Sequence, residues 1–255
     1  MTIAVTRPVS RSFEQCELTH LGREPLDVSR ATEQHAAYER LLRRLGATIV
    51  RVPAAHESPD AVFVEDTAVV LDEIAVITRP GADSRRTEPA AVAAALTAYR
   101  PLRSMSGPAT LDGGDVLRIG RTLYVGRSGR TNEHGIEQLR RFAEPFGYNV
   151  VPVEFSGCLH LKSAATAVGD VLLLLNPAWV SAAAFPGCEA MSVDDREPHA
   201  ANALRVAGSV VYPSQHPRTR DRIVARGLRV EETDCSELAK AEGAVTCCSL
   251  IFDAS

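Results

Sequence analysis

Several common signatures are missing from this sequence of 255 residues. The six cysteines form no CxxC pair, and the seven histidines form no HxH or HxxxH pattern, so no zinc site is indicated. Neither GxGxxG nor a P-loop occurs, which removes the usual signals of nucleotide binding. The net charge of -4 lacks the basic surplus that phosphate backbones require, so we expect no nucleic-acid partner.

Long apolar segments are missing as well. The longest apolar run, Val171 to Leu175, is far too short to span a bilayer, so we expect no membrane partner. The N-terminal "MTIAVTRPVSRSFEQ" has no basic region followed by an apolar one, so we expect no signal peptide. These features predict a cytoplasmic protein with reduced thiols. A catalytic cysteine is then an option to examine.

A hairpin pattern recurs four times. Each copy has two runs rich in Val, Ile or Leu on either side of a short turn. The turns fall at Asp72-Glu73, Gly120-Arg121, Gly169-Asp170 and Ala207-Gly208. The spacing of roughly 40 to 50 residues is typical of repeat architectures.

A helix and then a lone strand follow most hairpins. Helices are predicted over 85–100, 131–147 and 218–227, and only the weaker segment 178–185 is available in the third unit. At the N-terminus, a strand at 2–7, a helix ending near Gly46 and a strand at 47–53 form a unit that lacks its first strand. The apolar segment 243–252, with Cys247, is predicted to supply that strand. Five units then close into a ring without an open edge, as one α/β domain over 1–255.

Chemically useful residues fall at equivalent places in the units, and the closed ring would bring them to its centre. They are Asp60, Asp66, Asp112, Asp115, His160 and Cys247. A cysteine, a histidine and a carboxylate form a nucleophile, a general acid or base and an orienting group. Taken singly, each has a structural explanation, since a lone cysteine usually packs in a core and a lone histidine is usually a satisfied structural group.

Extra carboxylates beside a thiol weaken the nucleophile unless the substrate is a cation. Paired carboxylates match a planar guanidinium, and Arg85 and Arg130, at matching junctions between hairpin and helix, would hold a carboxylate at the other end of the substrate. The alternative is that both arginines are solvated surface residues. The constellation therefore predicts an arginine derivative as the substrate.

These motifs, in this order, resemble the dimethylarginine dimethylaminohydrolase family over nearly the whole chain. The motifs are "SPDAVFVEDTAVV", "ITRPGADSRRTE", "LDGGDVL", "GRTNEHG", "LHLKS" and "TCCSL". The resemblance implies a five-fold pseudosymmetric α/β propeller of ββαβ-type repeats, closed by the N- and C-terminal strands. It also implies hydrolysis of Nω-methylated arginines to citrulline and methylamines without a metal or an organic cofactor.

The resemblance also implies a role for each matching residue. Cys247 is the expected nucleophile, His160 the acid and base, and Asp112 the group that orients His160. The expected substrate-binding residues are Asp60, Glu65 and Asp66 at the guanidinium, Arg85 and Arg130 at the α-carboxylate, Leu18 in a lid, and Ala241 through its backbone.

The sequence departs from the family pattern at two positions, and two alternative functions remain open. Glu242 replaces an aspartate found in some members of the family, and Lys162 stands where the related deiminases have an aspartate. One alternative is the same chemistry on another guanidino compound such as arginine, and the other is a binding protein without catalysis. The sequence leaves open whether the chain forms a homodimer.

Overall fold

The computed structural model describes residues 1–254, which form five three-stranded sheets. In each sheet the middle strand pairs antiparallel with the first strand and parallel with the third. The sheets are β15 (Leu250–Asp253), β1 (Thr2–Thr6) and β2 (Thr48–Arg51); β3 (Ala68–Val70), β4 (Ala75–Ile77) and β5 (Leu102–Ser104); β6 (Val116–Ile119), β7 (Thr122–Arg127) and β8 (Asn149–Glu154); β9 (Ala165–Ala167), β10 (Leu172–Leu175) and β11 (Glu189–Ser192); and β12 (Leu204–Val206), β13 (Ser209–Pro213) and β14 (Arg229–Thr233). This repetition confirms the predicted five-fold pseudosymmetric propeller.

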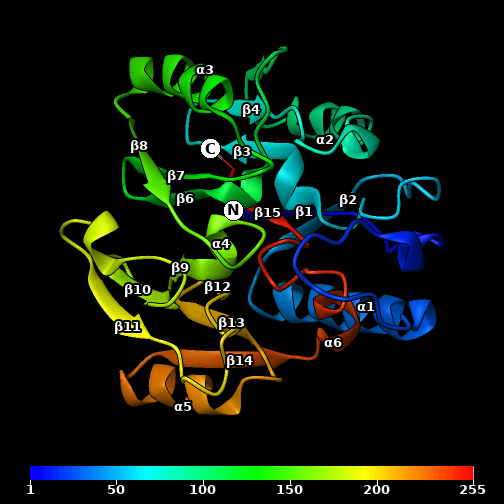
Figure 1. Cartoon of the computed structure of the whole chain (residues 1–255). Coiled ribbons are helices and arrows are strands. Elements are labelled where there is room, and N and C mark those ends of the chain that lie inside the picture. The colour runs from blue at the N-terminus through cyan, green and yellow to red at the C-terminus, as the bar shows by residue number, and fades with distance from the viewer. Residues whose placement is uncertain (255) are drawn as a thin grey trace.

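The connection between the two parallel strands of a sheet crosses over outside the ring, as parallel pairing demands. Four sheets use a helix for this connection: α1 (Val28–Arg44), α2 (Pro89–Leu96), α3 (Glu133–Ala143) and α5 (Pro217–Ala225). The fourth sheet has only the short 3-10 turn Ala182–Ala184, in agreement with the weak helical signal there. Figure 1 shows these four helices at the periphery and the strands nearer the middle.

The helix α1 illustrates how the sequence sets these elements. The Asp27 side chain accepts a hydrogen bond from the Arg30 amide and caps the first turn. Beyond the last turn, Gly46 adopts a φ of +91°, a left-handed conformation that favours glycine. One face of the helix is apolar and packs inward, since Ala31, Tyr38 and Leu42 are buried in one core cluster.

The ring closes where β15 pairs antiparallel with β1, with Thr2 opposite Asp253. The prediction that Cys247 lies on this strand is wrong, because β15 begins only at Leu250. The Cys247 amide donates to the carbonyl of Ala244 at 3.2 Å, so this segment turns back on itself and makes no ladder bond there. The preceding loop, and not the strand, therefore positions the thiol.

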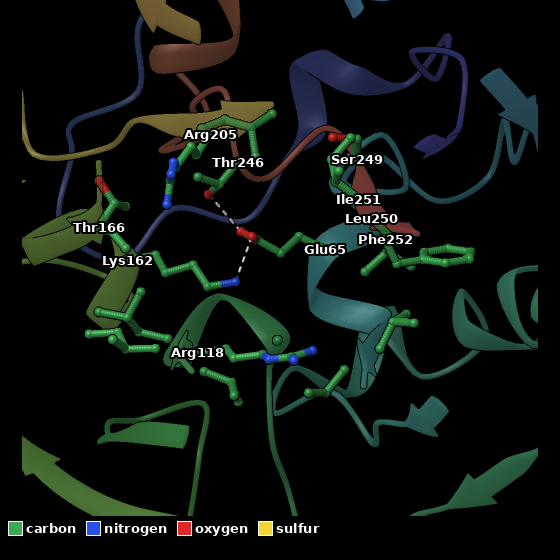
Figure 2. A pocket seen from close by; sticks show the side chains of 18 of the residues that line it. Glu65, Arg118, Lys162, Thr166, Arg205, Thr246, Ser249, Leu250, Ile251 and Phe252 are labelled. Atoms are coloured by element: carbon green, nitrogen blue, oxygen red, sulfur yellow. Dashed lines mark hydrogen bonds and ion pairs between the residues drawn. The ribbon is translucent and has the colours of Figure 1, made fainter. Parts of the chain in front are cut away.

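The first strands of all five sheets line a central cavity of about 640 Å³ (Figure 2). Glu65, Lys162 and Thr246 lie together in this cavity: the Glu65 carboxylate accepts a hydrogen bond from Lys162 Nζ at 2.7 Å and another from Thr246 Oγ1 at 2.8 Å. None of the helices within residues 1–254 is long and apolar enough to cross a membrane.

Candidate active site

A pocket forms where the segments that lead into the sheets meet the loop before β15. Seven residues singled out in the sequence line it: Asp60, Asp66, Arg85, Arg130, His160, Ala241 and Cys247. Two of them come from short elements at the start of a sheet, Asp66 from the 3-10 turn Val64–Thr67 and His160 from the residue before α4 (Leu161–Ala164). The closed ring thus brings together residues that are almost 190 positions apart, as the sequence predicts.

Asp112 lies directly behind the imidazole of His160. His160 Nε2 is 3.0 Å from Asp112 Oδ2, and the other carboxylate oxygen of Asp112 accepts the amide of Gly81 at 2.9 Å. Both side chains are almost fully buried. Burial alone would lower the pKa of His160, but Asp66 and then the hydrogen bond to Asp112 raise it to about 9. The imidazole is therefore protonated at neutral pH and can donate a proton.

Asp66 is held as a carboxylate beside the imidazole. Its Oδ1 lies 3.9 Å from His160 Nδ1 and accepts the amide of Gly114 at 3.0 Å. Its Oδ2 accepts Arg85 Nη1 at 2.6 Å. Burial would raise the pKa of Asp66, but His160 and Arg85 lower it below the usual value. A fixed negative charge therefore faces the pocket.

Arg85 is bonded within the protein through each of its three guanidinium nitrogens. Besides Asp66, it binds the carboxylate of Glu88 through Nε and Nη2 and the carbonyls of Asp60 and Phe63 through Nη2. Glu88 was not singled out in the sequence, although its position three residues after Arg85 offered a signal for an ion pair. The expected contact of Arg85 with a substrate carboxylate stays a prediction.

Cys247 is half-buried and faces this charge cluster. Burial, followed by the charges of Glu65 and Asp66, raises the pKa of the thiol well above its usual value. The free protein therefore holds a neutral thiol at neutral pH. A bound cation would offset these two carboxylates and favour the thiolate.

An N-terminal segment covers the pocket. The Glu17 amide donates to Asp60 Oδ2 at 3.1 Å, and Arg130 Nη2 donates to Thr19 Oγ1 at 3.3 Å. The Glu242 carboxylate accepts the three successive amides of residues 19–21. The remaining cavity has about 10 Å³, room for about one water molecule, so a substrate has to displace part of this cover.

Two of the predicted substrate-binding residues do not line this pocket. Glu65 turns its carboxylate to Lys162 and Thr246 in the central cavity (Figure 2). Leu18 lies in the covering segment, partly buried against the core cluster that contains α1. Their contacts with a substrate stay predictions.

One group of side chains within residues 1–254 has the composition and spacing to hold a metal ion. It consists of Asp66, Asp112 and His160, whose ligand atoms lie within 4.8 Å of one another. Both carboxylates already have strong partners, because Arg85 neutralises Asp66 and His160 binds Asp112. The same spacing also suits a histidine flanked by two carboxylates in acid–base catalysis.

The sequence and the fold have close counterparts among known proteins. A dimethylarginine dimethylaminohydrolase of Streptomyces coelicolor is 40% identical over 96% of this chain and 95% of its own length, and one of Pseudomonas aeruginosa is 36% identical over 92% of each. The family described as N,N dimethylarginine dimethylhydrolase, eukaryotic, matches residues 22–183. This chain belongs to the dimethylarginine dimethylaminohydrolase family.

A solved structure of the family shares the whole architecture. It is a Pseudomonas aeruginosa dimethylarginine dimethylaminohydrolase, a cysteine-to-serine variant in complex with citrulline. It superimposes with a TM-score of 0.94 at 34% identity and covers 98% of each chain.

Proposed function

We propose that this protein hydrolyses Nω-methylated arginines to citrulline and a methylamine through a covalent intermediate on Cys247. The observation that carries the proposal is a thiol, a buried His160–Asp112 pair and the carboxylates of Asp60 and Asp66 around one pocket. The names of the bacterial relatives and the citrulline complex of one of them support the same reaction here.

In the first step the guanidinium of the substrate docks against Asp60 and Asp66. Its positive charge offsets the carboxylates that keep the Cys247 thiol neutral. The thiol proton leaves, sulfur forms a bond to the central carbon, and protonated His160 donates a proton to the methylated nitrogen. The bond from carbon to this nitrogen breaks, and the neutral amine departs. His160 recovers the proton that the thiol gave up, and a cationic S-alkylthiouronium remains.

In the second step water attacks the thiouronium carbon. His160, after passing its proton to the released amine, accepts a proton from this water. The bond from carbon to sulfur breaks, and the protonated imidazole gives its proton to the sulfur. As the carbonyl forms, the remaining hydroxyl proton passes to the imidazole, and neutral citrulline leaves. The proton left over from the hydrolysis is carried away by the released amine, so the thiol and the imidazole return to their initial states.

Asp112 keeps the imidazole oriented in both steps and stabilises its protonated form. Arg130 would bind the α-carboxylate of the substrate, because its guanidinium donates to the neutral hydroxyl of Thr19 and not to a carboxylate within residues 1–254. Burial raises the pKa of Asp60, although the charge of Arg85 partly offsets this effect. The Asp60 carboxylate is available to the incoming cation. No step calls for a metal or an organic cofactor.

The reaction is tested by citrulline production from asymmetric dimethylarginine and from arginine, with the wild type and the Cys247→Ser variant. We expect citrulline from the methylated substrate and none from the variant. Equal or greater turnover of arginine would reassign the substrate to the unmethylated guanidino amino acid. A fully active Cys247→Ser enzyme would refute the covalent mechanism.

The proposal includes the cytoplasm as the location, because a thiol nucleophile works only in reduced form and all six cysteines are unpaired in residues 1–254. The formation of a homodimer, which the sequence leaves open, is tested by sedimentation of the purified protein.

A further inference from the structure

Asp115 is one of the polar residues at equivalent places in the repeating units and has no role in the proposed reaction steps. Asp115 ends the 3-10 turn Gly113–Asp115 just before β6 and is completely buried. Its Oδ1 accepts the amide of Leu161 at 2.9 Å. Its Oδ2 accepts two hydroxyl groups, Ser128 Oγ at 2.6 Å and Thr131 Oγ1 at 2.7 Å. One carboxylate thus joins three segments of the chain.

Each of these segments carries a residue of the proposed active site. Leu161 follows His160, so the bond to its amide fixes the backbone that carries the imidazole. Ser128 and Thr131 enclose Arg130, and Ser128 Oγ accepts the amides of Arg130 and Thr131 at 3.0 and 3.1 Å.

Asp112 is tied into the same network. Its amide donates to Thr131 Oγ1 at 3.2 Å, and this hydroxyl in turn donates to Asp115. The geometry points to Asp115 as the positioning residue that holds His160, Asp112 and the Arg130 loop in register. This inference rests on the proposed function, because it concerns the same catalytic machinery.

A carboxylate is needed at this position for a chemical reason. Ser128 Oγ already accepts two backbone amides, so it can only donate toward Asp115. An asparagine would keep the bond to Leu161 through its oxygen but would turn an NH₂ group toward two hydroxyl donors. Space is also limited, since a Cβ on Gly126 would come within 3.0 Å of Asp115 Oδ1. The segments therefore have to move apart in such a variant.

Asp115 acts on its neighbours and not on the substrate, because it does not line the pocket. Burial raises its pKa to about 6, against the opposing charge of His160, so it is ionised in mildly alkaline solution. Its charge joins those of Asp66 and Asp112 in stabilising the protonated imidazole. Loss of this charge should therefore lower the pKa of His160.

The test compares Asp115→Asn and Thr131→Val with a matched control, Glu197→Gln. Glu197 is also a buried carboxylate between segments, and it accepts the amides of Arg218 and Thr219 at the start of α5, outside the pocket. Thr131→Val keeps the side-chain volume, loses the hydroxyl that links Asp112 to Asp115, and provides a second variant if Asp115→Asn does not fold. Steady-state turnover of asymmetric dimethylarginine is measured across pH, with thermal unfolding in parallel.

We expect kcat to fall about 10- to 100-fold in both test variants, as for a displacement of catalytic groups by a fraction of an ångström to one ångström. In Asp115→Asn the pH above which kcat falls should be lower than in the wild type. Glu197→Gln should lose stability but keep the kcat and the pH profile of the wild type. Wild-type kcat and pH profile in a folded Asp115→Asn enzyme would overturn the inference, as would an equal loss of kcat in the control.

A readout without substrate separates this inference from the proposed function. The titration of the His160 imidazole is followed by NMR in the wild type and in Asp115→Asn, and we expect a lower pKa in the variant. A wild type without citrulline production would refute the proposed function alone. An unchanged His160 titration would refute the positioning role whatever the substrate proves to be.

Discussion

Folding stability should depend on pH through His160, and this dependence can be measured without substrate. The imidazole is only 5% exposed, and its pKa rises from 6.5 to about 9 because Asp66 and Asp112 outweigh the effect of burial. A group whose pKa is higher in the folded state than in the unfolded chain binds more protons when folded. Its contribution to stability is therefore complete below the unfolded pKa and is lost as the pH rises through the folded pKa.

The size of the effect follows from the two pKa values. Each pKa unit corresponds to about 1.4 kcal/mol, so the shift of His160 is equivalent to about 3 kcal/mol. Between about pH 6.5 and about pH 8.5 the linkage relation gives a loss of about 2 kcal/mol in the free energy of unfolding. The upper limit lies below the range in which the buried thiols, whose pKa values are raised, begin to ionise.

Urea unfolding of the wild type and of His160→Gln over this pH range measures the effect. The difference in unfolding free energy between the two proteins should shrink by about 2 kcal/mol from the acidic to the alkaline end. His134→Gln serves as the control, because His134 is exposed on α3. In this variant the free energy of unfolding should depend on pH as it does in the wild type. Parallel curves for the wild type and His160→Gln would refute a protonated buried imidazole.

Three further predictions concern binding, the covering segment and the core. Arg130→Ala should raise KM for asymmetric dimethylarginine about tenfold or more and change kcat little, because a charged hydrogen bond to the substrate tail contributes about 1.5–3 kcal/mol; a fall in kcat alone would contradict this. Glu242→Ala removes the carboxylate that accepts the amides of residues 19–21, so the covering segment should loosen. Trypsin should then cut at Arg23 faster in Glu242→Ala than in the control variant Glu24→Ala. Equal cleavage rates in the two variants would argue against the contact. Leu123→Ala, in a fully buried position on β7, should lower the free energy of unfolding by about 3 kcal/mol in urea titrations, and a cost below about 1 kcal/mol would show that the core collapses around the gap.

The architecture could be predicted because its signals are local. Hairpin turns such as Gly120-Arg121 and caps such as Asp27 lie next to the elements they define. Alternating apolar segments at a regular spacing then leave few ways to close the ring.

The placement of Cys247 could not be predicted in the same way. Its neighbours are apolar and β-branched, which is typical of a strand, yet the segment forms a turn. Asn202, 44 residues earlier, accepts the amide of Thr246 at 3.1 Å and donates to its hydroxyl at 3.0 Å. Contacts between distant residues therefore override the local strand preference.

The orientation of Glu65 depends on such contacts too. Its sequence position beside Asp66 suggests that both carboxylates face the guanidinium. Lys162 and Thr246, which lie far away along the chain, instead draw the Glu65 side chain into the central cavity. Partners of this kind become visible only once the ring is closed.

The pairing of β15 with β1 also bears on how the protein is made. β1 lies at residues 2–6 and its partner β15 at residues 250–253, so the first sheet stays incomplete until residues 250–253 have been synthesised. The loop with Cys247 directly precedes this strand, so the docking of the strand restricts where the thiol can lie. A nascent or truncated chain that lacks residues 250–253 therefore cannot complete the pocket that Cys247 lines.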